Sequence, residues 1–237
     1  MTGGSGGIGR AIAASFIAAG ATVAATSRSG RVPAATHGVA MELEQPDSIS
    51  AAMAEGERLL GGLDTLVVNA VRWPAGFAER FEAIDPTEWR AVLRANTEGA
   101  FSVVQAALPA LRASAAGRIV LISSGAAEEG HPPAPHYIAA KAALHGLCRA
   151  LAWDAGRDGV LVNVIAAGFT RTATNSERFG PEIFQRAGAL TPQRRVSTAE
   201  DVAALALWLG SAANTSVTGE VVREGTSAAR TPLVAVA

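Results

Sequence analysis

Residues 2–9 read Thr2-Gly3-Gly4-Ser5-Gly6-Gly7-Ile8-Gly9 and run into an alanine-rich segment that we expect to be helical. Glycines let a backbone approach a pyrophosphate closely, and the N-terminus of a helix presents free N–H groups and the positive end of its dipole. The spacing T-G-x-x-x-G-x-G therefore favours a nucleotide-binding loop, although a flexible turn would look similar.

Short apolar runs alternate with longer helical patterns along the rest of the chain, which is typical of βαβ units and a parallel sheet. We predict one α/β domain over residues 1–237, a Rossmann-like, doubly wound parallel sheet with helices on both faces. The expected strands are Ala21–Ser27, Val39–Leu43, Leu63–Asn69, Arg118–Ser124, Val160–Ala166 and Glu220–Arg223. The expected helices are Gly7–Ala19, Asp47–Leu60, Pro86–Ser114, Pro135–Arg157 and Thr198–Ser211.

Two segments of this pattern are unusually short. A strand should precede a nucleotide-binding loop, yet only Met1 and Thr2 stand before Gly3. We expect the first strand to be truncated or missing, and the natural start to lie upstream. The segment Ser29–Gly38 is at the lower limit for a helical crossover, so its helix should be reduced or absent.

Composition narrows the class of partner. The 237 residues carry a formal net charge of -1 with no basic stripe, which argues against a nucleic-acid partner. No apolar run or leader pattern predicts a membrane span or a secretory signal, so we expect a cytoplasmic protein. The single cysteine, Cys148, fits a reducing compartment and a packed thiol. No His/Cys/Asp cluster has metal-ligand spacing, so no metal is expected.

Two helical stretches, Gly99–Leu111 and Ala139–Trp153, are apolar nearly all round. A sheet can cover only one side of such a helix, so the other sides need another cover. We therefore predict that both helices form a subunit interface in a homo-oligomer.

Tyr137 and Lys141 are the one tyrosine and the one lysine of a chain with 20 Lys and Arg residues. Positions four apart share a helix face, so the phenol and the ammonium should project into one cleft. An ammonium can lower the pKa of a phenol from about 10 by roughly 1–3 units, toward the range of a proton donor. Chance is the alternative for so short a pattern.

Cofactor preference should depend on the end of the second strand. An NAD site places a carboxylate there to hold the ribose, and Ala25–Ser29 contains none. Arg28 could pair with a 2′-phosphate, with a hydrogen bond from Ser27 or Ser29. NADP(H) is therefore favoured over NAD(H), with a solvated loop arginine as the alternative.

Taken together, these motifs resemble the short-chain dehydrogenase/reductase family, in particular its 3-oxoacyl reductases, from Thr2 to about Gly225. Tyr137 and Lys141 match the family's Y-x-x-x-K, and Ser124 lies at its serine position, thirteen residues before Tyr137. Asn96 resembles the family's helix asparagine. From the residues alone, Ser124 could instead be a strand-end cap, and Asn96 a helix hydrogen-bonding residue.

The resemblance implies an oxidoreductase that interconverts a ketone and a secondary alcohol of small size by hydride transfer, and a homo-oligomer, often a tetramer. It makes Tyr137 the proton donor, Lys141 its partner and a ribose ligand, Ser124 the ligand of the substrate oxygen, and Asn96 the holder of a water. The cofactor-binding residues it implies, with those above, are Gly3, Ser5, Gly7, Ile8, Gly9, Ser27, Arg28, Glu42, Leu43, Asn69, Ala70, Tyr137, Lys141, Gly168, Thr170 and Thr172.

The chain departs from the family pattern at three places. Val71 replaces the glycine of N-A-G, Ala167 replaces the proline of P-G, and Glu224 begins a segment that is usually D-G-G. A β-branched residue cannot adopt a positive φ cheaply, so Val71 should narrow the space beside the cofactor. These changes motivate a rival, a catalytically silent nucleotide-binding or scaffold protein. An NAD-linked alcohol dehydrogenase is the nearer alternative.

The substrate side is less defined. We expect residues 173–192 to form a substrate lid whose Phe179, Phe184 and Leu190 give it an apolar face. Trp73 and Pro74 are expected walls of the pocket, and His131 and His136 are expected to be wall or exposed residues. The sequence names no substrate and leaves dependence on a carrier protein open.

Overall fold

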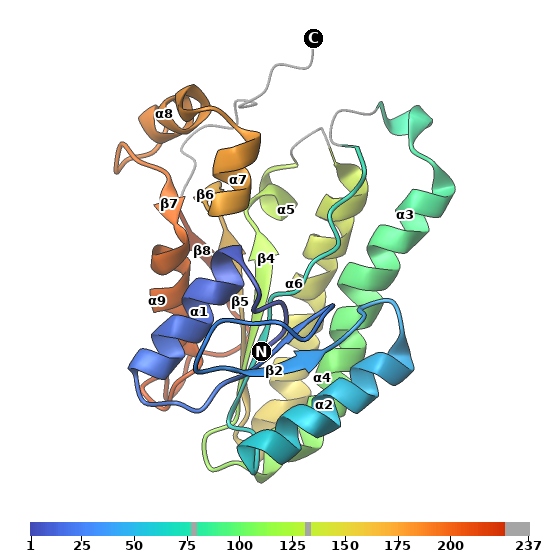
Figure 1. Cartoon of the computed structure of the whole chain (residues 1–237), viewed down its shortest axis with the longest axis vertical. Helices are drawn as coiled ribbons and strands as arrows, with labels where there is room; N and C mark the ends of the chain where they lie inside the picture. The colour runs from blue at the N-terminus through green and yellow to red at the C-terminus, as the bar shows by residue number, and fades with distance from the viewer. Residues whose placement is uncertain (77–79, 131–133, 226–237) are drawn as a thin grey trace.

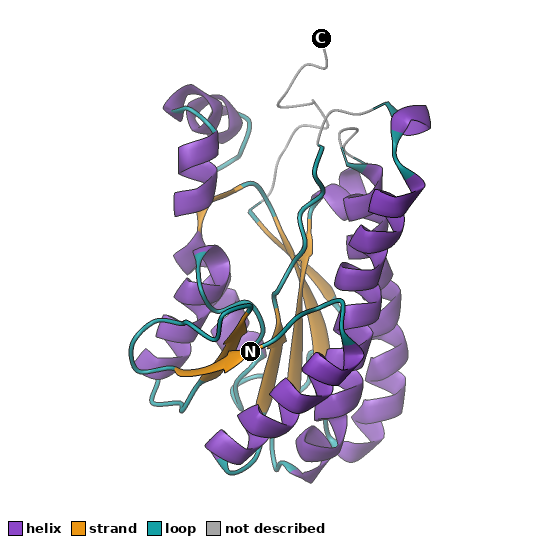
Figure 2. Ribbon diagram, turned by 45° about the vertical axis from the view of Figure 1, so that its right-hand side comes forward, coloured by secondary structure: helices purple, strands orange, loops and turns teal. Residues whose placement is uncertain are grey.

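The structure is a computed structural model that describes residues 1–76, 80–130 and 134–225 (Figure 1). It confirms the doubly wound fold: a parallel sheet lies between two layers of helices (Figure 2). Four strands pair in the order β3-β4-β5-β8, and two further pairs, β1-β2 and β6-β7, stand apart from them. The strands are β1 Ala24–Ser27, β2 His37–Ala40, β3 Thr65–Val68, β4 Arg118–Ser124, β5 Leu161–Ala167, β6 Thr170–Arg171, β7 Ser197–Thr198 and β8 Val221–Glu224.

Helices cover both faces because the central strands are apolar on both. Ile119 and Leu121 of β4 pack with the α2, α4 and α6 layer, whereas Val120 and Ile122 pack with α1 and α9. Cys148 of α6 is fully buried in the first of these layers, as expected for a packed thiol. The helices are α1 Gly7–Ala18, α2 Pro46–Leu60, α3 Pro86–Leu93, α4 Gly99–Ala113, α5 Ala126–Glu129, α6 Pro135–Ala155, α7 Ala173–Arg178, α8 Pro181–Ala189 and α9 Ala199–Leu209.

The predicted helix Pro86–Ser114 is present, with a wider turn inside it. Residues Arg94–Glu98 form a π turn between α3 and α4, and short 3₁₀ turns occur at Phe81–Ala83 and Gly156–Asp158. Single π turns inside helices are frequent at functional sites. This one contains Asn96.

The connection from β1 to β2 contains no helix, as expected from its length. The strand β2 begins at His37, earlier than the predicted Val39, because the parallel register pairs Ala24 with His37 and Ser27 with Ala40. The chain then leaves the sheet at Met41, whose side chain is buried.

Met1 and Thr2 lie between β1 and β3, in the position of a first strand. The Met1 amino group donates to Ala24 O (2.7 Å), Thr26 N donates to Met1 O (3.0 Å), and Thr2 N donates to Val67 O (2.9 Å). Toward the amino ends of β1 and β3, the space beyond Met1 is a cavity of about 730 Å³, lined in part by Phe16. The pair β1-β2 is therefore separated from the four-stranded sheet over most of its length, and residues 1–4 join the two.

Candidate active site

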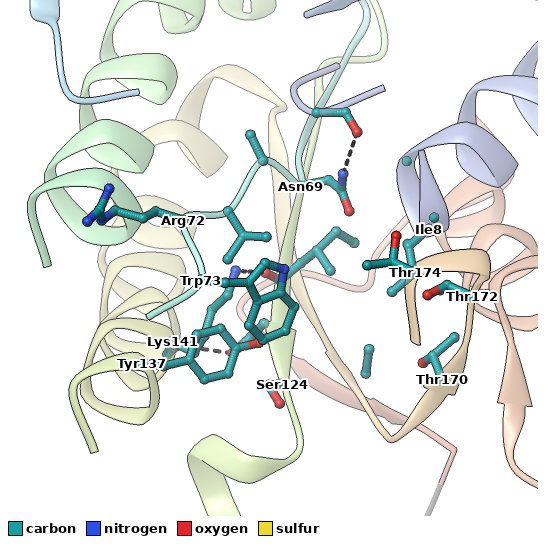
Figure 3. Close-up of a pocket in the computed structure, with 18 of the residues that line it drawn as sticks. Ile8, Asn69, Arg72, Trp73, Ser124, Tyr137, Lys141, Thr170, Thr172 and Thr174 are labelled. Atoms are coloured by element: carbon teal, nitrogen blue, oxygen red, sulfur yellow. Dashed lines mark hydrogen bonds between the residues drawn. The ribbon is translucent and has the colours of Figure 1, made fainter. Parts of the chain in front are cut away.

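The carboxyl ends of the strands border a cavity of about 930 Å³, and Figure 3 shows side chains that line it. Loops after parallel strands meet at this edge, which is where open α/β sheets bind ligands. All sixteen residues expected to bind a cofactor line this cavity, as do Ser124, Tyr137 and Lys141, whereas Asn96 does not.

The glycine loop is tightly braced. Gly3 has φ +69°, and a Cβ at Gly9 would lie 2.0 Å from Gly3 O. The Asn69 side chain donates its Nδ2 to the same Gly3 oxygen (3.0 Å), while the Thr2 hydroxyl accepts from Asn69 N (3.0 Å). Asn69, at the end of β3, thus fixes the path of the loop that enters α1.

The residues present fit a dinucleotide. The N-cap of α1 is Gly6, which gives the first turn no side-chain cap, so its N–H groups are available to a phosphate. No heavy atom outside its chain neighbours lies within 4 Å of a Cβ built at Gly6, and Gly7 has φ +51°. A bound nicotinamide dinucleotide would place its pyrophosphate against this turn.

Arg28 lies exposed at the rim of the cavity, after β1. Within residues 1–76, 80–130 and 134–225 it has no ion-pair partner, unlike Arg72 and Arg223. The Ser27 hydroxyl donates to Arg31 O (2.9 Å), so its oxygen can still accept. The rim therefore offers a cation at the position where the sequence analysis expects a 2′-phosphate to bind.

Ser124, Tyr137 and Lys141 come together from two elements. Ser124 ends β4, and the other two lie on one face of α6, one turn apart (Figure 3). Ser124 lies close enough to the Tyr137 hydroxyl to lower the pKa of the phenol, and the Ser124 oxygen accepts from Ala126 N (3.2 Å). Lys141 Nζ donates to Ile122 O (2.8 Å).

Burial governs the protonation of this pair. It raises the pKa of Tyr137 to about 12, against a smaller lowering by the Ser124 hydrogen bond. It also lowers the pKa of Lys141 to about 8. The expected lowering of the phenol's pKa by the ammonium is wrong for this structure, because Lys141 Nζ lies 6.0 Å from the Tyr137 ring centroid and is directed at Ile122 O.

Asn96 uses its side-chain amide on the loop after β3. Its Nδ2 donates to Arg72 O (2.9 Å), and its Oδ1 accepts from Arg72 N (2.8 Å). The π turn directs this buried amide toward Arg72. One amide N–H and the amide oxygen of Asn96 are therefore engaged with the Arg72 backbone, and Asn96 does not line the cavity.

Comparison with known proteins agrees with this geometry. A family model described as enoyl-(acyl carrier protein) reductase matches residues 3–223. The 3-oxoacyl-[acyl-carrier-protein] reductase FabG of Aquifex aeolicus is 35% identical, over 94% of this chain and 93% of the relative. MabA of Mycobacterium avium, with the same description, is 34% identical over 94% of this chain and 86% of the relative.

A solved short chain dehydrogenase/reductase family protein superimposes with a TM-score of 0.81 at 31% identity, covering 94% of this chain and 93% of that one. The chain belongs to the short-chain dehydrogenase/reductase family. As a member of that family it is an oxidoreductase with the Rossmann fold. The family match extends across almost the whole of the chain that the structure describes.

At Val71 and Ala167, where this short-chain dehydrogenase/reductase departs from its family pattern, the surrounding structure accommodates the change. Val71 is not among the non-glycine residues with positive φ, so its β-branched side chain is unstrained there. It packs beside Val92 and Tyr137. The carbonyl of Ala167 accepts from Gly125 N (2.8 Å), which ties the loop after β5 to the loop that carries Ser124.

Two expectations for the substrate side of this short-chain dehydrogenase/reductase are wrong: the lid phenylalanines do not face the cavity, and His136 is neither a wall residue nor exposed. Phe179 and Phe184 pack against Phe169, at ring-centroid distances of 5.6 and 5.1 Å, instead of facing the cavity. The segment 173–192 contributes Thr174 and Asn175 to the cavity wall. Its phenylalanines pack in a small core with Ala187 and Val196.

His136 is also not a wall residue: it is 2% exposed and does not line the cavity. His131 lies outside the described residues. Within them, no helix is long and apolar enough to cross a membrane, and no three His, Cys, Asp or Glu residues gather as metal ligands would.

Sequence reasoning missed Arg72 and Arg223, which both line the cavity. Arg72 pairs with Glu88 (2.9 Å) and Glu44 (3.3 Å), and Arg223 pairs with Glu128 and Glu129 of α5. Arginines are common in this chain, and their partners are distant in sequence. No local pattern could have marked these two.

Proposed function

We propose that this protein is an NADP-dependent oxidoreductase that interconverts a ketone and a secondary alcohol at Ser124, Tyr137 and Lys141. The observation that supports it is that Ser124, Tyr137 and Lys141 line the same cavity as the glycine loop, with the two hydroxyl-bearing residues close together. Two hydroxyls side by side can both bind one carbonyl oxygen. A dinucleotide bound at the nearby loop would lie within reach of that oxygen.

When bound, NADPH supplies a hydride to the carbonyl carbon. Tyr137 donates its proton to the carbonyl oxygen as negative charge develops there, and Ser124 holds that oxygen by a hydrogen bond. Lys141 lies behind the phenol with a pKa lowered by burial to about 8, so it can return a proton near neutral pH. Ile122 O orients its amine.

The preference for NADP(H) is proposed from Arg28. Arg28→Ala should raise the KM for NADPH roughly tenfold, the lower end for one lost charge-assisted hydrogen bond, and leave the KM for NADH unchanged. Steady-state kinetics with both cofactors measure this. Arg31→Ala is the matched control, since Arg31 is exposed three residues away and does not line the cavity. An equal rise with both cofactors would remove Arg28 from specificity and favour the NAD-linked alternative.

The function itself is tested by NADPH consumption across β-ketoesters, quinones, cyclic ketones and carrier-bound 3-oxoacyl thioesters. We expect oxidation of NADPH with at least one class. Binding of NADPH without oxidation by any class would favour the catalytically silent rival. The 3-oxoacyl thioesters are included because the curated relatives carry that activity in their names.

We further propose a cytoplasmic homo-oligomer assembled through α4 and α6. Phe101 of α4 is 50% exposed and Trp153 of α6 is 81% exposed, and both lie on the stretches predicted to form an interface. Large exposed aromatic side chains are enriched where subunits meet. Light scattering of the purified chain gives its mass in solution and tests this proposal.

A further inference from the structure

Trp73 follows β3, and hydrogen bonds hold the chain on both sides of it. On one side, the Arg72 backbone is bonded at both N and O to Asn96, and its guanidinium pairs with Glu88. On the other side, Ala75 N donates to the same Glu88 carboxylate (2.9 Å). One carboxylate thus ties down both flanks of Trp73 and places its backbone beside the cavity.

That place is directly over the proposed proton donor. The Trp73 and Tyr137 rings stack at 4.9 Å between centroids with an angle of 22° between their planes (Figure 3). Trp73 is nevertheless 51% exposed, and it lines the cavity. A substrate whose carbonyl oxygen reaches Ser124 and Tyr137 must place its adjoining group beside this flat surface.

The lid side of the cavity offers little to a long alkyl chain. The lid residues at the cavity are Thr174 and Asn175, since Phe179 and Phe184 belong to the lid's own core. Phe169 does line the cavity, and it is itself a flat ring. The described walls near the hydroxyl pair therefore combine aromatic and polar side chains with the aliphatic residues Val71 and Ile122.

We propose that Trp73 selects carbonyl compounds conjugated to a planar ring, such as aryl ketones, over aliphatic ketones and acyl chains of similar size. The inference rests on the proposed function and names the substrate class for it. Stacking between flat rings adds to the energy of area burial, whereas an alkyl chain gains from burial alone. The reaction is unchanged: a hydride goes to the carbonyl carbon, a proton goes to its oxygen, and NADP⁺ and a secondary alcohol result.

The test compares 1-tetralone, a bicyclic aryl ketone, with 2-decanone, an aliphatic ketone of the same carbon number. We expect kcat/KM to favour 1-tetralone, and Trp73→Leu to reduce that preference by roughly threefold to tenfold. Trp73→Phe, which keeps a flat ring, should retain most of it. An unchanged ratio in Trp73→Leu, or an equal loss with both ketones, would overturn the inference.

A second measurement does not depend on turnover. Calorimetry of 1-tetralone binding is made on NADPH-saturated Tyr137→Phe protein, with and without Trp73→Leu. We expect weaker binding in the double variant by a similar factor, with little change for 2-decanone. Equal affinity for 1-tetralone would sink the role of Trp73 even if the enzyme reduces other ketones, so this failure is distinct from a failure of the proposed function.

Discussion

Replacing Tyr137 with Phe should lower kcat for ketone reduction by roughly 10²–10⁴-fold, the usual contribution of a positioned proton donor. The variant removes one oxygen and keeps the ring that stacks on Trp73 and packs with Val92 and Ala140. The fold and the glycine loop should therefore be untouched. Single-turnover kinetics measure the chemical step, and NADPH fluorescence measures binding.

The affinity for NADPH should change little, because the pyrophosphate site at α1 lies on another element. Ser124→Ala is the companion variant. It removes the second hydroxyl and should also reduce kcat, while keeping a proton donor in place. Full activity in Tyr137→Phe would take the proton-donor role away from Tyr137 and leave Ser124 or a water as the acid.

Gly9→Ala should have the second large effect. A Cβ at Gly9 would lie 2.0 Å from Gly3 O and 2.7 Å from Asn69 Nδ2, so the loop must move. We expect a loss of about 1–3 kcal/mol in the free energy of unfolding, the usual cost of overpacking. Displacing the loop should also weaken NADPH binding at least about tenfold. Thermal unfolding and NADPH titration measure the two effects.

The matched control is Gly56→Ala, inside α2. A Cβ there would meet no atom nearer than Ala24 Cβ at 4.0 Å. It should stabilise the protein by about 0.5–1 kcal/mol, since glycine is costly in a helix interior. If Gly9→Ala behaved like Gly56→Ala, the Gly3 oxygen would not be where the structure places it.

The sequence predicts elements well where burial on both faces leaves one solution. The strand β4 begins and ends at the predicted residues, Arg118 and Ser124, because its side chains are covered from both layers. The strand β1 begins at Ala24, later than the predicted Ala21. Residues 21–23 border the cavity beside Phe16, and the ladder with β2 begins only at the pair Ala24 and His37.

The sequence predicts which residues form the site better than it predicts the contacts that they make. Spacing predicted that Tyr137 and Lys141 share a helix face, the family resemblance added Ser124, and all three line one cavity. It could not tell that Phe184 faces inward, because two short helices can bury their apolar side against the protein or toward a ligand. Nor could it find the Asn96–Arg72 bonds, which depend on a π turn.

Because β1-β2 is separate from the four-stranded sheet, the two ends of the cavity belong to different units of the fold, the β1-β2 pair and the four-stranded sheet with its helices. Arg28 stands on the smaller unit, and Tyr137 stands on the larger. Residues 1–4 and the packing of α2 on α4 connect them. The grip on the far end of a dinucleotide and the hydroxyl pair are therefore separable, so substitutions near Arg28 should change cofactor affinity without moving Ser124 or Tyr137.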